Sequence, residues 1–458
     1  MLLLALLEIF AAWRPAFTQG RSHRRAVAQA LGTLVSFGRR TLSRALWALG
    51  HQQQDWSAEY KLHSRAAWKP ERLFQPVLEK ALPLCTGRYI AAAIDDTRLH
   101  KTGRHIETAF YQRDPLSPKF RFNLMFGLRF LQISLLVPLY RKQEASARAL
   151  PVRFEEVPAL RHPARKAPPE QWATYRQEVK KTNLSTRAVA TIAGFRASLD
   201  EAGQNARPLL MVGDGSFCNR TLFTADLPRT ELIVRARRDL KLCGKADGDS
   251  RSFYDKVKFT PEQVLKDESI PWCEVSIFLG GQWRELRCKE VTGVYWQSGA
   301  KKRPLRLFVV APVPYQVPGR KRKYYRDPAF LLTTDLTGTP QELLQAYFDR
   351  WQIEVNHREE KDTLGVGQAQ VRSKRSVPRQ PAFAVAAYSA LHLAALLTFG
   401  PGRDEHYQPL PKWRRNANRP SFLDLLTLLR KEIAENPALL TSLGFRIDWK
   451  QLGLAAAA

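Results

Sequence analysis

The stretch "RYIAAAIDDTRL", residues 88–99, is an apolar run of strand length that stops at Asp95 and Asp96. "RPLLMVGDGSF", residues 207–217, repeats this pattern and stops at Asp214. The carboxyl ends of strands in open α/β sheets face ligand crevices, so an Asp directly after an apolar run is a candidate for chemistry. An Asp that caps a turn through its own side chain leaves the same signature, and neither stretch alone decides between the two.

The segments around these stretches favour a mixed α/β fold. Residues 120–140 predict two buried strands, separated by Gly127 and Pro138. Residues 222–335 hold short alternating runs divided by Gly, Pro and basic turns, which indicates several more strands. Residues 329–336 predict a strand, and residues 339–362 and 381–398 predict helices. The β-rich block therefore lies between a core strand and the final helices.

The charge balance indicates a polyanionic partner. The chain of 458 residues has a net charge of +29 and a sequence pI of about 10.2, which favours nucleic acid. Its five Cys form no C-x-x-C pair, so we expect reduced thiols in the cytoplasm. The N-terminal apolar run is broken by Glu8 and lacks a basic region before it, and residues 382–400 contain His392. We therefore expect neither a signal peptide nor a membrane span, and we interpret residues 382–400 as a buried core helix.

A third acidic position lies in "YFDRWQIEVNHREEKDTLGVGQAQVR", residues 347–372. Tyr347, Arg350, Glu354 and Lys361 recur at intervals that place them on one helix face. Glu can bind a divalent metal, Arg and Lys can bind phosphate oxygens, and Tyr can donate a hydrogen bond to a phosphate. The alternative is a solvated helix with ion pairs such as Arg350–Glu354 or Glu354–Arg358. Elsewhere on the helix, we expect Leu343, Leu344 and Trp351 to pack into the core.

The spacing Y-x(2)-R-x(3)-E-x(6)-K resembles the signature helix of bacterial insertion-sequence DDE transposases of the "YREK" type. Trp351, Ile353 and His357 fit the usual surroundings of that signature, and "IDDT" and "GDGSF" resemble the two Asp motifs of the family in the right order. The resemblance covers roughly residues 35–400. It implies a ribonuclease-H-like core in which a β-strand insertion separates Asp214 from Glu354.

The resemblance also implies a chemistry. Two divalent cations, Mg²⁺ or Mn²⁺, would be held by Asp214, Glu354 and either Asp95 or Asp96. The enzyme would cut transposon ends and join the freed 3′-OH to target DNA. The residues expected to contact DNA are Tyr347, Arg350, His357, Arg358 and Lys361, with Trp296 or Trp283 stacking a flipped base. The basic segments add Arg235, Arg237, Arg238, Arg320, Lys321, Arg322 and Lys323.

The expected partners are the terminal inverted repeats, the target DNA and a second copy of the chain, in the bacterial cytoplasm at the nucleoid. We expect a helical DNA-binding region at 1–80, the ribonuclease-H-like core at 81–221 and 329–400, a β-rich insertion at 222–328 and, at 401–458, a helical region that is a candidate for dimerisation. The alternatives are a metal-dependent nuclease without strand joining and a non-catalytic transposase relic. An RNA-binding protein has less support, because neither a KH-type loop nor an aromatic RNP pattern is evident.

Overall fold

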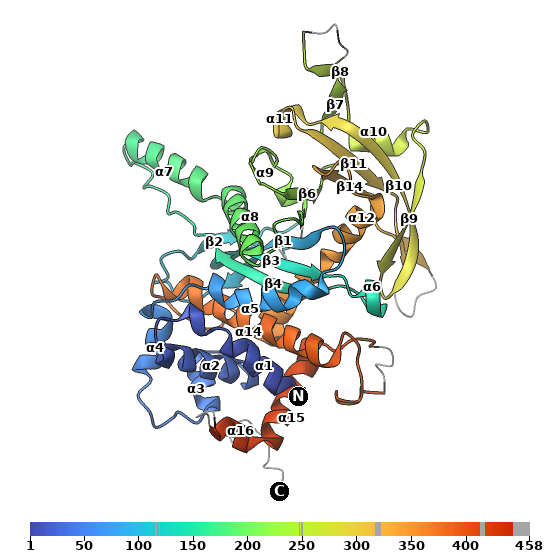
Figure 1. Cartoon of the computed structure of the whole chain (residues 1–458). Coiled ribbons are helices and arrows are strands. Elements are labelled where there is room, and N and C mark those ends of the chain that lie inside the picture. Colours follow the sequence, from blue (N-terminus) through green and yellow to red (C-terminus); the bar gives the residue numbers. More distant parts are fainter. Residues whose placement is uncertain are drawn as a thin grey trace.

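The computed structural model describes residues 1–114, 117–118, 120–246, 248, 251–316, 322–412 and 417–442. The N-terminal part is helical, as predicted, and consists of α1 (Leu2–Ala11), α2 (Gly20–Val35), α3 (Leu42–Ala48), α4 (Ser57–Ser64) and α5 (Glu71–Ala81). Helices α1, α2, α4 and α5 pack against α14 (Ser376–Phe399), and α3 packs against α2. Helices α1 and α2 also pack against α15 (Phe422–Glu435), and α16 (Pro437–Ser442) follows at the C-terminal side (Figure 1). Glu432 on α15 accepts hydrogen bonds from the backbone nitrogens of Leu2 and Leu3, so the two ends of the described chain meet.

A large sheet forms the centre of the molecule. Its first part consists of β1 (Ile90–His100), β2 (Phe110–Arg113), β3 (Leu124–Val137), β4 (Arg148–Glu156), β5 (Leu209–Gly213) and β6 (Thr230–Arg235). Strand β3 is antiparallel to β1 and to β4, whereas β5 and β6 run parallel to β1. The helices α6 (Tyr140–Gln143), α7 (Pro169–Thr182), α8 (Leu184–Glu201) and α9 (Arg220–Phe223) lie between these strands in the sequence. Three antiparallel strands followed by two parallel ones make this a ribonuclease-H-like α/β core.

Two details of the core differ from the sequence-based prediction. Residues 120–140 form one long strand instead of two, since β3 passes through Gly127 without a break. A Cβ at Gly127 would lie 2.3 Å from the carbonyl oxygen of Leu99, so the glycine allows β1 and β3 to approach closely. Strand β1 also continues beyond Asp96 to His100, because its pairing with β3 extends that far, while its parallel pairing with β5 ends at Ile94.

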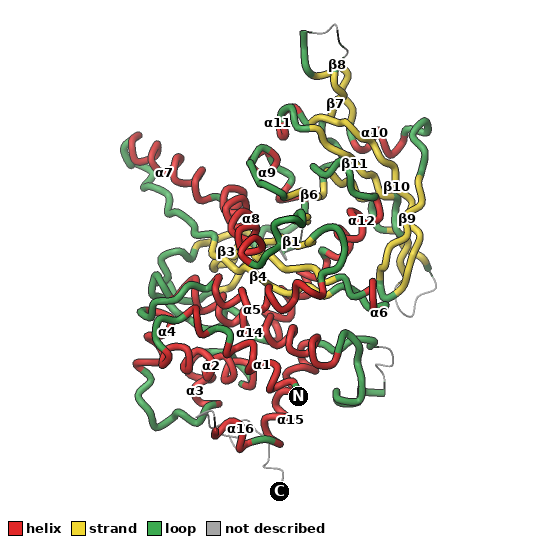
Figure 2. The backbone as a smooth tube through the Cα atoms, viewed as in Figure 1, coloured by secondary structure: helices red, strands yellow, loops and turns green. Residues whose placement is uncertain are grey.

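The strands of the β-rich block extend the same sheet on its β6 edge (Figure 2). They are β7 (Leu242–Lys245), β8 (Tyr254–Phe259), β9 (Cys273–Leu279), β10 (Gln282–Tyr295) and β11 (Pro304–Val310), with the short helices α10 (Pro261–Lys266) and α11 (Gln297–Ala300). Strand β14 (Ala329–Thr333), at the start of the predicted core range 329–400, lies between β11 and β6. Strands β12 (Pro314–Gln316) and β13 (Lys323–Tyr325) form a separate hairpin. Strand β14 pairs antiparallel with β6, so the block is joined to the core through the hydrogen bonds of the sheet.

Helices cover both faces of the core sheet. Helices α12 (Pro340–Asp349) and α13 (Trp351–Arg358) pack on one face, where Leu343, Leu344 and Ile353 are buried against strand residues such as Ala93. A π-helical turn, Glu359–Thr363, follows α13. The opposite face packs against α5, α8 and α14.

Helix α14 is the one helix within the described ranges that is long and apolar enough to cross a membrane. Within its most apolar window, 83% of the residues are buried inside the protein. It contacts β4, α1 and α5, so the prediction of a buried core helix is confirmed.

Candidate active site

Four polar side chains form a row across the central strands. The parallel pairing places Ile94, Gly213 and Val234 side by side, so the next residues on β1, β5 and β6 are Asp95, Asp214 and Arg235. On the other side of β1, Asp95 is paired with Gln132 of β3. Strand residues two apart point to the same face, and Ala93, Val212 and Ile233 belong to the core cluster beneath α12 and α13. The row therefore lies on the face that these two helices cover.

The helices above this row bring the third acid to the site. Thr339 starts α12 with a capping box that it forms with Glu342, which fixes where the helix begins. Tyr347 lies near the end of α12, Arg350 lies between the two helices, and Glu354 lies on α13. The Arg350 guanidinium donates a hydrogen bond to Oε1 of Glu354 at 3.0 Å.

The electrostatics of the site link these residues to the Asp pair. Burial raises the pKa of Asp95 to about 7; repulsion from Asp214 adds to the rise, and Arg350 opposes it. Burial also raises the pKa of the Tyr347 phenol, where Arg350 opposes the rise, and Asp214 and Glu354 add to it. One charge shifts the pKa of another group only when the two lie close together. The acids Asp95 on β1, Asp214 after β5 and Glu354 on α13 therefore lie near one another.

Asp96 lies in a different environment from Asp95. It follows Asp95 on the strand, so its side chain points to the opposite face of the sheet. There its carboxylate accepts a hydrogen bond from Nε of Arg129 at 2.8 Å, and its side chain is only 12% exposed. The structure therefore distinguishes the two Asp residues that the sequence left as alternatives, because their side chains lie on opposite faces of the sheet.

The donor set of the row suits a hard divalent cation. The row contains the carboxylates of Asp95 and Asp214, and burial and repulsion from Asp214 raise the pKa of Asp95. A Mg²⁺ or Mn²⁺ ion bound through the carboxylate oxygens would neutralise this concentrated negative charge. Among the described residues, however, no group of three or more His, Cys, Asp or Glu side chains already has the geometry of a metal site. Glu354 is paired with Arg350 through Oε1, so its second carboxylate oxygen is the one available to a cation while this ion pair is intact.

Two cavities border the site and meet at Arg235. One of about 750 Å³ extends from Gly215, next to Asp214, along Arg237 and Arg238. The other, of about 840 Å³, is lined by Tyr347, Arg350 and Trp351 together with Tyr315, Tyr325 and Arg326 of the β12–β13 hairpin region. Both cavities are thus lined by Arg residues, as expected for a surface that receives phosphates.

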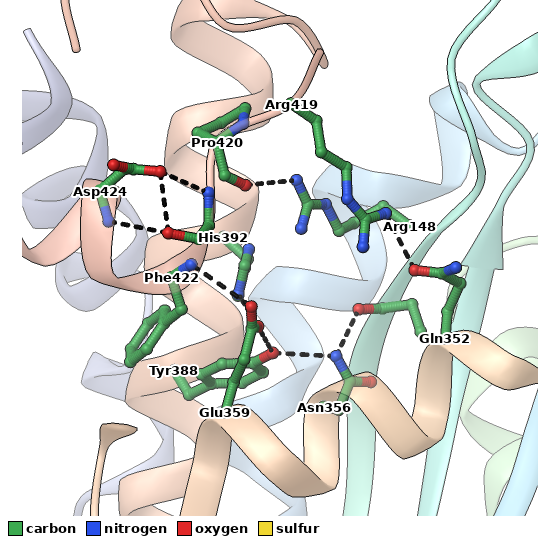
Figure 3. A network of polar contacts seen from close by, with 12 residues as sticks. Arg148, Gln352, Asn356, Glu359, Tyr388, His392, Arg419, Pro420, Phe422 and Asp424 are labelled. Carbon is green, nitrogen blue, oxygen red and sulfur yellow. Dashed lines mark hydrogen bonds and ion pairs between the residues drawn. The ribbon is translucent and has the colours of Figure 1, made fainter. Parts of the chain in front are cut away.

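A buried polar network holds α13 in place (Figure 3). Asn356 accepts a hydrogen bond from the hydroxyl of Ser134 on β3 and donates to Tyr388 of α14. Glu359 accepts a hydrogen bond from the Tyr388 hydroxyl at 2.7 Å and lies 3.3 Å from Nε2 of His392. Because Ser134 is two residues from Gln132, this network joins the helix of Glu354 to the strand beside Asp95.

Several other predicted site residues lie in surroundings that the sequence did not suggest. His357 is 7% exposed, and burial lowers the pKa of its imidazole to about 3. Trp296 is 9% exposed, packs edge-on against Phe223 and covers Gly299. Stacking on a flipped base would require Trp296 to leave this packing, so that role stays a prediction.

Most of the remaining aromatic and basic residues within the described ranges are exposed. Trp351 is 55% exposed, so the prediction that it packs into the core is wrong, and Trp283 is 47% exposed. Arg358, Arg237, Arg238 and Arg322 are also exposed, and Lys361 lies in the π-helical turn, close enough to His357 to lower its pKa. Arg320 and Lys321 lie outside the described residues, as does the side chain of Lys323.

A comparison with protein-family models agrees with this geometry. The model described as "DDE superfamily endonuclease" matches residues 14–251, slightly more than half of the chain. The chain is a DDE superfamily endonuclease. A comparison with curated proteins gave no match. Membership in the family points to nuclease or transposase activity on DNA, and enzymes of this type generally use divalent metal ions.

The family match includes both Asp motifs of this DDE superfamily endonuclease but ends before the helix of Glu354. The sequence interpretation missed Gln132, which is fully buried beside Asp95, and the ion pair between Arg129 and Asp96. A lone Gln within the apolar run "FLQISLLV" was the available signal, since a polar residue in a buried strand needs a partner.

Proposed function

We propose that this DDE superfamily endonuclease is the transposase of a bacterial insertion sequence, which cuts the ends of the element and joins the 3′-OH to target DNA. The observation that carries the proposal is the juxtaposition of Asp95 and Asp214 on adjacent strands beneath the helix with Glu354. Acids placed in this way could hold the cations of metal-assisted phosphodiester chemistry, and the net charge of +29 favours DNA as the substrate.

The three acids Asp95, Asp214 and Glu354 are the proposed ligands of two Mg²⁺ or Mn²⁺ ions. When bound, such ions supply an activated water and stabilise the departing 3′ oxygen. Asp95 is the proposed first ligand because it shares a face with Asp214, whereas Asp96 is paired with Arg129. Asp96 then acts from the opposite face, by anchoring β1 to β3.

The other residues of the signature helix act on the phosphates. Arg350 is paired with Glu354 without DNA; once the carboxylate turns towards a cation, the guanidinium is free to bind a phosphate oxygen. Tyr347 has a raised phenol pKa, so it keeps its proton and can donate a hydrogen bond to the same strand. Lys361 and Arg358 would contact the backbone further along the helix.

The wider DNA path follows the cavities at Arg235. Arg237, Arg238 and Arg322 would bind backbone phosphates there, and the helices at residues 1–80 would bind the terminal inverted repeats. We further propose that two copies of the chain pair on DNA and that the enzyme works in the cytoplasm at the nucleoid.

The test compares Glu354→Gln and Asp214→Asn with the wild type. We expect both variants to bind a duplex with the ends of the element in Ca²⁺ as the wild type does, and to lose cleavage in Mg²⁺ by about a thousandfold or more. Cleavage by Glu354→Gln at the wild-type rate would overturn the assignment of this acid. A pre-cut end incubated with a target plasmid distinguishes a transposase, which joins the strands, from a nuclease on the same fold.

A further inference from the structure

Residues 157–183 form an arm that projects from the ribonuclease-H-like core. The arm consists of the segment 157–168 and α7, and α7 extends beyond the body of the molecule (Figures 1 and 2). None of the residues of α7 is buried. A helix of this length is only marginally stable in water by itself. We therefore expect that a binding partner stabilises this exposed helix.

The arm is held together by its own aromatic residues. The rings of His162, Trp172 and Tyr175 contact one another with centroids 4.7–6.1 Å apart, and the Tyr175 hydroxyl lies 3.1 Å from Nε2 of His162. These contacts fasten the segment before α7 to the helix. None of the large hydrophobic residues exposed in the described chain belongs to the arm. The arm therefore lacks the apolar face that a second protein copy would need.

The charge on the arm identifies the kind of partner. The arm contains six Lys and Arg residues and only two Glu residues. Lys181 is paired with Glu178 at 2.9 Å. The other five cations are exposed and form no ion pair with any carboxylate in the described ranges; they are Arg161, Arg165, Lys166, Arg176 and Lys180. Such a cluster of unpaired, exposed positive charge is complementary to a phosphate backbone.

We propose that this arm binds the backbone of double-stranded DNA outside the active site. The inference rests on the proposed function in one respect, namely that the substrate is DNA. Helix α8 connects the arm directly to β5, which ends at Asp214, so the arm and the active site belong to one continuous segment of the chain. The arm contacts phosphates without reading bases, and it lengthens the stretch of DNA that each copy holds.

The test measures how the affinity of the full-length protein for a duplex depends on salt, in Ca²⁺ so that no cleavage occurs. Arg176 and Lys180 are four residues apart and lie on one side of α7. The double variant Arg176→Gln/Lys180→Gln removes two phosphate contacts, so the slope of log affinity against log salt should become shallower by about two. The affinity at 0.1 M salt should fall by at least about tenfold. The thermal unfolding midpoint should not change, because neither side chain is buried.

Matched single variants provide the control. Lys180→Gln should reduce the slope by about one, whereas Lys431→Gln, at an exposed position on α15, should leave it unchanged. Hydroxyl-radical footprinting should show lost protection over one segment of the duplex in the double variant. Equal slopes for the double variant and Lys431→Gln, or altered self-association in place of altered DNA binding, would overturn the proposal. Absence of DNA binding by the wild type would instead refute the proposed function.

Discussion

Replacement of Glu359 by Ala tests whether the buried network beneath α13 fixes the helix that carries Glu354. The Glu359 carboxylate accepts hydrogen bonds from the Tyr388 hydroxyl at 2.7 Å and from the backbone nitrogen of Phe422 at 3.4 Å, and it lies 3.3 Å from the His392 ring. These contacts connect the end of α13 to α14 and to the start of α15. Tyr388 is fully buried, and His392 is 2% exposed, so both groups depend on the Glu359 carboxylate for their hydrogen bonds.

The expected magnitude follows from these contacts. A hydrogen bond to a charged group contributes about 1.5–3 kcal/mol, and a buried donor left without an acceptor costs about 1–3 kcal/mol more. We therefore expect Glu359→Ala to lower the free energy of unfolding by about 3–5 kcal/mol. Glu359→Gln keeps one acceptor oxygen and should cost about 1–2 kcal/mol.

Urea unfolding followed by circular dichroism measures this difference. Glu435→Ala serves as the control, because Glu435 belongs to an exposed, weak pair with Lys431 and should change stability by less than about 0.5 kcal/mol. A loss below about 1 kcal/mol for Glu359→Ala would refute the network as the element that fixes α13.

Three further predictions concern other parts of the molecule. Burial raises the pKa of Glu360 from 4.5 to about 8, so the folded chain keeps a proton that the unfolded chain releases above about pH 4.5. The contribution of Glu360 to the free energy of unfolding should therefore fall by about 1.4 kcal/mol per pH unit between these values, and the stability advantage of Glu360→Gln over the wild type should grow from pH 6 to pH 8 in urea unfolding; a constant difference would contradict this. Gly127→Ala should cost about 1–3 kcal/mol, since its Cβ would lie 2.3 Å from the Leu99 carbonyl, whereas Gly194→Ala, which meets nothing within 4 Å, should be neutral or stabilising in the same assay. DNA affinity in Ca²⁺ should fall steeply with salt, with a slope of about −5 or steeper in fluorescence anisotropy, and a flat dependence would argue against phosphate contacts.

The strands and helices of the core could be predicted from the sequence because each has a recognisable pattern of apolar residues. The apolar runs before Asp95 and Asp214 predicted strands, and the periodicity of residues 339–362 predicted a helix, which the structure resolves into α12, α13 and a π-helical turn. The prediction of two strands at Gly127 was wrong, since a glycine in a strand marks a turn or a close approach of two backbones, and the sequence does not say which.

The sequence could not predict on which face of the sheet each acid lies, because this depends on pairing between strands that are far apart in the chain. Asp95 and Asp96 are equivalent in the sequence, and only the register between β1, β3 and β5 places one beside Asp214 and the other beside Arg129. Exposure of Trp351 also depends on the neighbours that the helix acquires in the fold. The spacing of Tyr347, Arg350, Glu354 and Lys361 indicated that they share one helix face, but it could not show which residues of the sheet lie opposite that face.

We predict that Asp95 and Asp214, but not Asp96, hold a divalent cation. Titration of Mn²⁺ into the full-length protein, followed by calorimetry or by the electron paramagnetic resonance of free Mn²⁺, tests it directly. We expect Asp95→Asn and Asp214→Asn each to weaken Mn²⁺ binding by at least about tenfold, and Asp96→Asn to bind Mn²⁺ as the wild type does. Loss of binding in Asp96→Asn together with wild-type binding in Asp95→Asn would show that Asp96, and not Asp95, is the ligand.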